Sequence, residues 1–506
     1  MISLKQKALV LASGIFITHQ VLATENYNTD IPSSIMTPDT VQTSIGELNF
    51  KDGVPTTETA QKIYDNLDTL RSTEVFLNAI PMASMEAIRV GTARIGSTSS
   101  NQVVLFDNLM DSNPLFLTGN TDTVYALAFL DLKKDGPTVI EVPESMGPTT
   151  VNDAFFRFVT DLGIVGPDKG KGGKYLILPP DYKGEVPEGY FVSKSTSYTN
   201  LLIAREFLKD GKTDAAVKTY KESLRIYPLA KKDDQPKMEF ISGSGKSFNT
   251  IHANDEHFYS EIKTVLDKEP ISFIDPELRG LMASIGIQKN KPFAPDERMQ
   301  KLMKDGIAIG NATARSLYFQ PRDKKTYIYE DRLWKTGFIG QDYRWLVDKG
   351  EGGRNLDART YFFYMATVNT PAMELKLIDK GSQYALIDQA KGGEFFDGGK
   401  HYKLNIPANV PVKNFWSVVV YDTQTRSELQ TSQPLPSKND QRDGVIENKD
   451  GSIDLYFGPT PSKGKEANWI ETVPGKGWFT ILRLYGPQEA WYEKTWKPSD
   501  IEEIKL

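Results

Sequence analysis

An early stretch of the chain has apolar residues at the spacing of an amphipathic helix. They recur three and four residues apart between Ala60 and Leu70, which predicts a helix that begins near Thr57. Because proline cannot continue helical hydrogen bonding, we expect a break near Pro81 and a second helical segment after it. The polar stretch before the helix, residues 26–54, has no sustained period. It predicts an extended arm.

Short apolar runs separated by Gly, Pro and Asp turns come next. The predicted strands span residues 103–106, 123–132, 138–142, 155–159, 175–178 and 190–192. Along residues 123–132 both alternating faces are apolar, so we expect this strand to be buried on both sides. Short strands with such turn signals predict a β-sandwich over residues 101–200.

Helical periodicity returns at Leu201. The predicted helices span residues 201–208, 213–227, 254–266, 276–285 and 295–317. The first two predict a helical hairpin that ends before Pro228. Gly306, Gly310 and Ala314 place small side chains four residues apart, so another element is expected to approach the last helix closely. Residues 201–317 are therefore expected to form a small helical domain.

Strands return in the last third of the chain. They are predicted at residues 361–368, 384–387, 402–406, 415–421, 453–457 and 479–485. Asp-Gly pairs at 397–398 and 450–451 are typical of turns between strands. This pattern predicts a jelly-roll-like β-sandwich over residues 318–506. The expected fold class is mainly β with an α-helical middle domain: an N-terminal β-sandwich, a small helical domain and a C-terminal jelly-roll-like β-sandwich.

The first residues have the pattern of a secretory signal peptide. Two lysines precede an apolar run from Ala8 to Ile17, and this run is shorter than the about 20 residues that a membrane helix needs. Small residues before position 24 favour cleavage after Ala23. We therefore expect residues 1–23 to be a signal peptide, residues 24–100 to hold the arm and helices, and the mature protein to be periplasmic or secreted without a membrane span.

Composition excludes several classes of chemistry. The chain has no cysteine, which excludes disulfides, thiol nucleophiles and thiolate metal sites. A net charge of −6 over 506 residues, without a run of basic residues interleaved with aromatics, argues against a nucleic-acid partner. Oligomerisation stays open.

Several segments resemble a family of bacterial proteins. The run Asn-Thr-Asp-Thr-Val-Tyr at residues 120–125 resembles the start of the DUF1254 domain, and the segment 450–459, with the Trp-rich block after it, resembles the DUF1214 domain. Residues 275–278, 283–287 and 310–315 are similar to the region between the two domains. The resemblance implies the same fold of two β domains around a small helical one. It implies no established activity.

A polar group within apolar strands supplies the candidate ligand-binding residues, which are Asn120, Asp122, Tyr125, Asp153 and Arg157. Asp and Arg are costly to bury unless they are paired. One interpretation is a turn held by Asp122 beside a partly buried ion pair between Asp153 and Arg157. The other is a polar cluster at the mouth of an aromatic-lined pocket, in which Asp122 and Arg157 face the same space.

No metal or cofactor is predicted. Once the signal peptide is removed, only His252, His257 and His401 remain. Five-residue spacing puts the first two on different faces of a helix, so a polar helix start is favoured over a metal or acid–base site that includes Asp255. The tryptophans near the C-terminus are expected to close a core, with stacking on sugar rings as the alternative.

These patterns do not specify a reaction, and whether the protein is an enzyme stays open. The favoured hypothesis is an exported protein that binds a glycan or a small molecule in a cleft between domains, where ligand sites concentrate. One alternative is a periplasmic hydrolase whose site is assembled across domains. Another is a structural or assembly protein.

Overall fold

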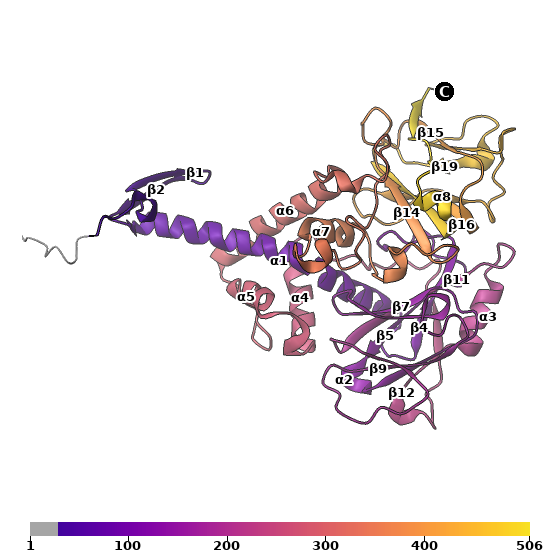
Figure 1. Cartoon of the computed structure of the whole chain (residues 1–506), viewed down its shortest axis with the longest axis horizontal. Helices are drawn as coiled ribbons and strands as arrows, with labels where there is room; N and C mark the ends of the chain where they lie inside the picture. The colour runs from indigo at the N-terminus through magenta and orange to yellow at the C-terminus, as the bar shows by residue number, and fades with distance from the viewer. Residues whose placement is uncertain (1–28, 506) are drawn as a thin grey trace, which may run out of the picture. The chain divides into compact units, whose positions relative to one another are not determined.

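A computed structural model describes residues 29–505 (Figure 1). The predicted signal peptide lies outside these residues. Within the described range, no helix combines the length and apolar character needed to cross a bilayer. The chain divides into two compact units, one up to Asn66 and one from Leu67 onward. Each is described by itself below.

The first unit contains a small sheet where an extended arm was expected. Strands β1 (Thr40–Thr43), β2 (Gly46–Lys51) and β3 (Val54–Pro55) form a three-stranded antiparallel sheet in sequence order. The turn between β1 and β2 is held by the Thr43 hydroxyl, which donates to the carbonyl of Gly46 at 2.7 Å. Polar residues on both faces explain why the pattern gave no strand signal.

Helix α1 (Thr57–Arg94) begins where it was predicted but continues through Pro81. A proline within a helix leaves the carbonyl four residues earlier without its usual donor. Here that carbonyl belongs to Leu77, and the hydroxyl of Thr360 donates to it at 3.4 Å. The expected break is therefore wrong, because a distant side chain replaces the missing backbone donor.

Two sheets follow and share one core. The larger has the order β13-β4-β5-β11-β7-β8 and the smaller the order β10-β9-β6-β12. The larger sheet contains β4 (Gln102–Leu105), β5 (Thr123–Asp131), β7 (Thr149–Asp153), β8 (Phe158–Leu162), β11 (Thr199–Phe207) and β13 (Glu239–Ser242). The smaller contains β6 (Thr138–Val142), β9 (Gly173–Leu178), β10 (Phe191–Lys194) and β12 (Arg225–Pro228). Buried side chains of both sheets belong to one hydrophobic cluster, as in a β-sandwich.

Strand β5 is buried on both faces, as its sequence predicts. Val124 and Ala126 lie in the core between the two sheets. Tyr125 and Leu127 lie in the neighbouring core that includes Phe76 of α1 and the other long helices. The larger sheet is therefore covered by the second sheet on one side and by helices on the other.

Two predictions about local structure in this region are wrong. Residues 201–208 form most of β11, a central strand, rather than a helix, and the helix after it, α3 (Asp214–Ser223), is shorter than predicted. Residues 155–157, placed at the start of a strand, instead belong to a turn with Phe156 at a φ of 53°.

The helical middle consists of α4 (His257–Lys268), α5 (Pro276–Ser284) and α6 (Glu297–Phe319). The small residues of α6 have the predicted role. A Cβ atom at Gly306 would lie 2.5 Å from the Cβ of Ser72, and one at Gly310 would lie 2.7 Å from the ring of Phe76. Glycine therefore permits the close approach of α6 to α1.

The C-terminal region is a second pair of packed sheets, ordered β14-β20-β16-β17 and β19-β18-β15-β21. The first contains β14 (Ser382–Ile387), β16 (Val412–Asp422), β17 (Ser437–Asn439) and β20 (Trp478–Pro487). The second contains β15 (His401–Ile406), β18 (Ile453–Gly458), β19 (Trp469–Glu471) and β21 (Glu502–Ile504). Both contribute to one core, which includes the buried Trp478, Trp491 and Trp496. These tryptophans close a core, as expected.

One helix in this part of the chain was predicted as a strand. Residues 356–365 form α7 (Leu356–Met365), which Asn355 caps by accepting a hydrogen bond from the backbone N–H of Ala358. The described residues also form two short α-helices, α2 (Leu132–Asp135) and α8 (Glu489–Tyr492). The fold is thus mainly β with a helical middle, and α7 lies among elements of both β regions (Figure 1).

Candidate functional site

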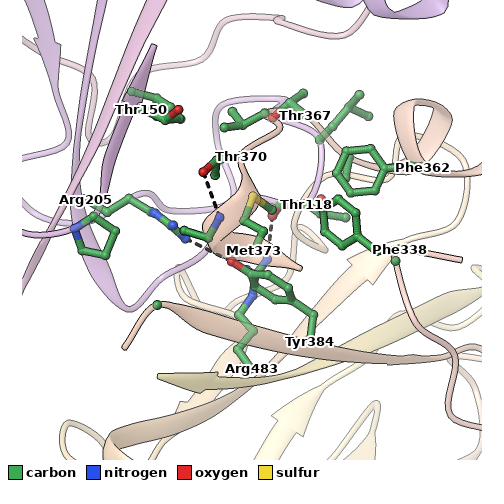
Figure 2. A pocket seen from close by; sticks show the side chains of 18 of the residues that line it. Thr118, Thr150, Arg205, Phe338, Phe362, Thr367, Thr370, Met373, Tyr384 and Arg483 are labelled. Atoms are coloured by element: carbon green, nitrogen blue, oxygen red, sulfur yellow. Dashed lines mark hydrogen bonds between the residues drawn. The ribbon is translucent and has the colours of Figure 1, made fainter. Parts of the chain in front are cut away.

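A cavity of about 80 Å³ lies between the two β regions. Tyr125 (β5), Thr150 (β7) and Arg205 (β11) line it from the N-terminal side, while Tyr384 (β14) and Arg483 (β20) line it from the C-terminal side (Figure 2). Much of the remaining wall is apolar: Phe116, Ile203, Phe338, Phe362, Met365, Met373, Leu386 and Ile481. The cavity therefore combines apolar walls with a cluster of polar groups.

Two guanidinium groups and a phenol form that cluster. Nη1 of Arg205 donates to the hydroxyl of Tyr384 at 3.1 Å, and the guanidinium carbon of Arg483 lies 5.3 Å from the centre of the Tyr384 ring. Figure 2 shows the side chain of Arg205 reaching the Tyr384 hydroxyl, with Arg483 beside the ring. The three groups come from strands that are far apart in the sequence.

The bonds of Arg483 go to neutral groups. Its Nη2 donates to the carbonyl of Thr118 at 2.6 Å, to that of Gly119 at 3.1 Å and to the hydroxyl of Tyr421 at 2.7 Å. Its Nε atom is buried without a partner. Among the described residues, neither Arg483 nor Arg205 has a carboxylate within 4.0 Å. Neither arginine therefore makes a direct ion pair, although the charge of Arg483 acts on the buried carboxyl of Glu428 and that of Arg205 on Asp161.

The arginines change the acidity of their neighbour. Burial alone would raise the pKa of Tyr384, but the positive charges of Arg205 and Arg483 outweigh this and lower it. At Tyr125, burial has the larger effect and raises the pKa to about 12 despite the same two arginines. Tyr384 is thus the phenol that loses its proton more readily.

One carboxyl group also lines the cavity. Asp161 lies in β8, one residue before the strand ends, and is 7% exposed. The hydroxyl of Thr370 lies 2.7 Å from both of its oxygens and donates to them. Burial raises the pKa of Asp161 to about 6, although the hydrogen bonds from Thr370 and Thr150 and the charge of Arg205 act in the opposite direction. Asp161 therefore titrates close to neutral pH.

Three of the residues predicted from sequence form one network. Nδ2 of Asn120 donates to the hydroxyl of Tyr125 at 2.6 Å. Asp122 is fully buried and accepts hydrogen bonds from the hydroxyl of Ser417, from Tyr485 at 3.1 Å and from Nδ2 of Asn439 at 3.2 Å. Asp122 therefore joins the start of β5 to three strands of the C-terminal region: β16, β17 and β20.

The other two predicted residues form a separate pair. Nε of Arg157 donates to Asp153 at 2.6 Å, and its Nη2 donates to the carbonyl of Phe273 at 2.8 Å. Asp153 is 1% exposed, whereas the Arg157 side chain is 43% exposed. The structure confirms this ion pair but places Asp122 and Arg157 in different networks. Of the five predicted residues, only Tyr125 lines the cavity.

The histidines do not assemble a metal site. No group of three or more His, Asp or Glu side chains suited to a metal ion occurs within residues 29–505. His257 is exposed and pairs with Asp255 at 2.9 Å beside the start of α4. His252 is buried against Phe76 and Phe258, and burial lowers its pKa to about 4. His257 thus belongs to a polar helix start, and His252 is a buried ring whose neutral form is favoured.

Sequence reasoning missed the cavity's charged residues, although each leaves a signal. Arg205 and Arg483 stand within otherwise apolar strands, in the runs Leu-Leu-Ile-Ala-Arg and Ile-Leu-Arg-Leu-Tyr. A charge within a strand that is buried on both faces needs a partner or a ligand. Residues 201–208 were interpreted as a helix, on which an arginine can face solvent, so that signal was lost.

The comparisons with known families agree with the resemblance in the sequence. Residues 100–228 match the family described as protein of unknown function DUF1254, and residues 381–489 match the family described as protein of unknown function DUF1214. Both domains occur in the expected order. The cavity lies where they meet, since Tyr125 and Arg205 belong to the first segment and Tyr384 and Arg483 to the second.

One solved structure has a similar fold. A crystal structure of the VPA0106 protein from Vibrio parahaemolyticus is 18% identical, aligns over 87% of this chain and 100% of its own, and has a TM-score of 0.53. An uncharacterized protein from Burkholderia cenocepacia is 11% identical over 89% of this chain and 97% of its own, with a TM-score of 0.40. No curated protein matches this chain. The first structure supports the fold alone.

Proposed function

We propose that this protein binds a small organic anion in the cavity, with the acid group between Arg205 and Arg483. The apolar part of the ligand packs against the aromatic and aliphatic walls, and Tyr384 supplies a hydrogen bond. The proposal is consistent with an exported protein that binds small molecules, the function favoured by its sequence. An apolar cavity with a cationic end suits an organic acid better than a glycan.

The observation that carries the proposal is that neither of the two arginines forms a direct ion pair. A buried charge is costly unless it is paired or well hydrogen-bonded. Within residues 29–505, the side chain of Arg205 has one hydrogen-bond partner, the Tyr384 hydroxyl, and Arg205 lines the cavity. Guanidinium groups bind carboxylates through short, directional hydrogen bonds. A bound carboxylate would therefore satisfy both arginines at once.

The volume limits the size of the ligand. A water molecule needs about 10 to 15 Å³ of such space, so a cavity of about 80 Å³ accommodates roughly five to eight heavy atoms. Short-chain carboxylates from butyrate to hexanoate have this size. The corresponding neutral amides have nearly the same shape. Comparing the affinities of carboxylates and amides therefore distinguishes recognition of the charge from binding by shape alone.

The test is a titration of the full chain with acetate, butyrate and hexanoate, and with the matching amides. Binding is measured by calorimetry and by the shift in melting temperature. We expect saturable binding and stabilisation by at least one carboxylate and none by its amide. Arg205→Gln should weaken that binding by roughly 10 to 100-fold, the range typical of a lost hydrogen bond to a charged group.

The matched control is Arg322→Gln, which removes an exposed arginine that also bonds a carboxylate, Asp357. It should leave binding unchanged. Two results would contradict the proposal: amides that bind as tightly as carboxylates, or Arg205→Gln protein that keeps its wild-type affinity while remaining folded by circular dichroism.

A hydrolase is the second candidate, favoured by two groups with shifted pKa values at one cavity. Asp161 has a pKa of about 6 and Tyr384 a lowered pKa, and such groups are suited to proton transfer near neutral pH. This candidate predicts cleavage of small chromogenic esters, with a rate that rises as the pH rises through about 6 and that is lost in Asp161→Asn and Tyr384→Phe. Wild-type protein without such activity would refute it and leave the binding proposal intact.

A further inference from the structure

A second, larger hollow adjoins the cavity. This outer groove has a volume of about 600 Å³ and shares four wall residues with the cavity: Gly337, Phe338, Met373 and Tyr384. Phe338, Met373 and Tyr384 are labelled in Figure 2. Because the same residues line both spaces, Phe338, Met373 and Tyr384 form part of the wall between the outer groove and the cavity. Gly337 adds no side chain to that partition.

The walls of the outer groove are richer in positive than in negative charge. Lys325, Lys376 and Lys494 line it from three different segments, and Glu374 is the one carboxyl group among its described wall residues. Burial and the charge of Asp342 raise the pKa of Glu374 to about 7, so it is partly neutral at physiological pH. Lys376 also lies 3.7 Å from an exposed carboxylate outside the groove wall.

We propose that the outer groove is the route by which ligands reach the cavity, and that its lysines select anions before they pass Phe338 and Met373. This inference rests on the proposed function, because it extends the anion preference of the cavity to its entrance. A cleft lined by one sign of charge raises the local concentration of the opposite charge and speeds association at low salt. Phe338 and Met373 have side chains that can change rotamer to open the passage.

The absence of cysteine from the chain allows a test that needs no ligand. Thr367→Cys places a single thiol in the wall of the cavity, at a position whose side chain is 8% exposed. Negatively and positively charged methanethiosulfonate reagents of similar size then report the route by their reaction rates. Thr150→Cys, at another wall position, repeats the test in case the first variant does not fold. Thr264→Cys, at an exposed position of α4, is the matched control.

We expect the anionic reagent to modify Thr367→Cys at least tenfold faster than the cationic one at low salt, with the difference shrinking as salt screens the lysines. Adding Met373→Trp should slow both reagents at least tenfold, and adding Lys325→Glu with Lys494→Glu should remove the preference for the anion. None of these changes should alter the rates at Thr264→Cys.

Equal rates for the two reagents, no reaction at either cavity position, or a rate that Met373→Trp leaves unchanged would each overturn the entry route. These results are independent of the carboxylate titration. If carboxylates bind but the labelling pattern fails, the cavity site stands and ligands enter elsewhere. If labelling follows the pattern but no carboxylate binds, the entrance stands and the proposed ligand class is wrong.

Discussion

The buried ion pair between Lys335 and Asp388 permits a quantitative test of the energetics of the C-terminal region. Their charged atoms are 2.8 Å apart, and the side chains are 1% and 2% exposed. Nζ of Lys335 also donates to the last carbonyls of α6, those of Tyr318 at 3.3 Å and Phe319 at 3.4 Å. Lys335→Met would remove the cation and leave the carboxylate buried alone.

Removing one partner of a buried ion pair costs about 3 to 5 kcal/mol, and we expect Lys335→Met to lower the free energy of unfolding by this amount. Burial lowers the pKa of Lys335 and raises that of Asp388, despite their mutual attraction. Burial of the two charges therefore costs more than their pairing returns. The double variant Lys335→Met, Asp388→Leu should consequently recover most of the loss and reach about wild-type stability.

Urea unfolding followed by tryptophan fluorescence measures this directly, because Trp334 is fully buried next to Lys335. The matched control is Lys391→Met, which breaks an exposed pair with Glu502 at a similar distance of 2.7 Å and should leave stability unchanged. The reasoning is refuted if Lys335→Met is no less stable than Lys391→Met, or if the double variant is less stable than Lys335→Met alone.

Three further changes test other parts of the structure. The folded protein binds the proton of Asp161 more tightly than the unfolded chain does. As the pH rises from 3.5 to 7, the free energy of unfolding of the wild type should therefore fall by about 3 kcal/mol relative to that of Asp161→Asn. A stability difference between the two proteins that stays constant in urea unfolding across this range would contradict the pKa shift. Asp122→Asn should cost about 1 to 3 kcal/mol. Whichever way the amide turns, its NH₂ group faces a donor: the hydroxyls of Ser417 and Tyr485 on one side, or Nδ2 of Asn439 on the other. A melting temperature near wild type would contradict it. Gly310→Ala should cost about 1 to 3 kcal/mol, because the new Cβ is forced against Phe76. Gly280→Ala is the matched control: its new Cβ has no atom within 4 Å, so it should stabilise α5 by up to about 1 kcal/mol. Equal melting temperatures for the two variants would exclude the packing argument.

Strands were predictable from the sequence where turn residues delimit a short run of apolar residues. Strand β6 has the predicted bounds of residues 138–142, because turn residues delimit a short apolar run. Residues 201–208 and 361–368 were assigned to the wrong element for a shared reason. Both segments begin with a largely buried run of consecutive apolar or aromatic residues, 201–204 and 361–366, so the period that separates helix from strand is lost.

The candidate site was predictable only in part. Tyr125 was found because it lies in a strand whose polar start is unusual. The Asp153–Arg157 pair was found because its two charged residues flank the aromatic residues Phe155 and Phe156. Arg205 and Arg483 meet through tertiary structure alone. Their strands belong to different sheets, and neither local spacing nor composition indicates which distant strands will face each other.

The hydrogen bonds of Asp122 constrain how a gene for this protein can be divided. The carboxylate lies in the segment 100–228, while its donors Ser417 and Tyr485 lie in the segment 381–489. Expressed alone, the first segment would hold an acid that has lost these donors, and the second would present two hydroxyl groups without their acceptor. Recombination that moved one segment into another protein would carry this cost with it. The two domains are therefore expected to be inherited together, and recombinant expression should keep both.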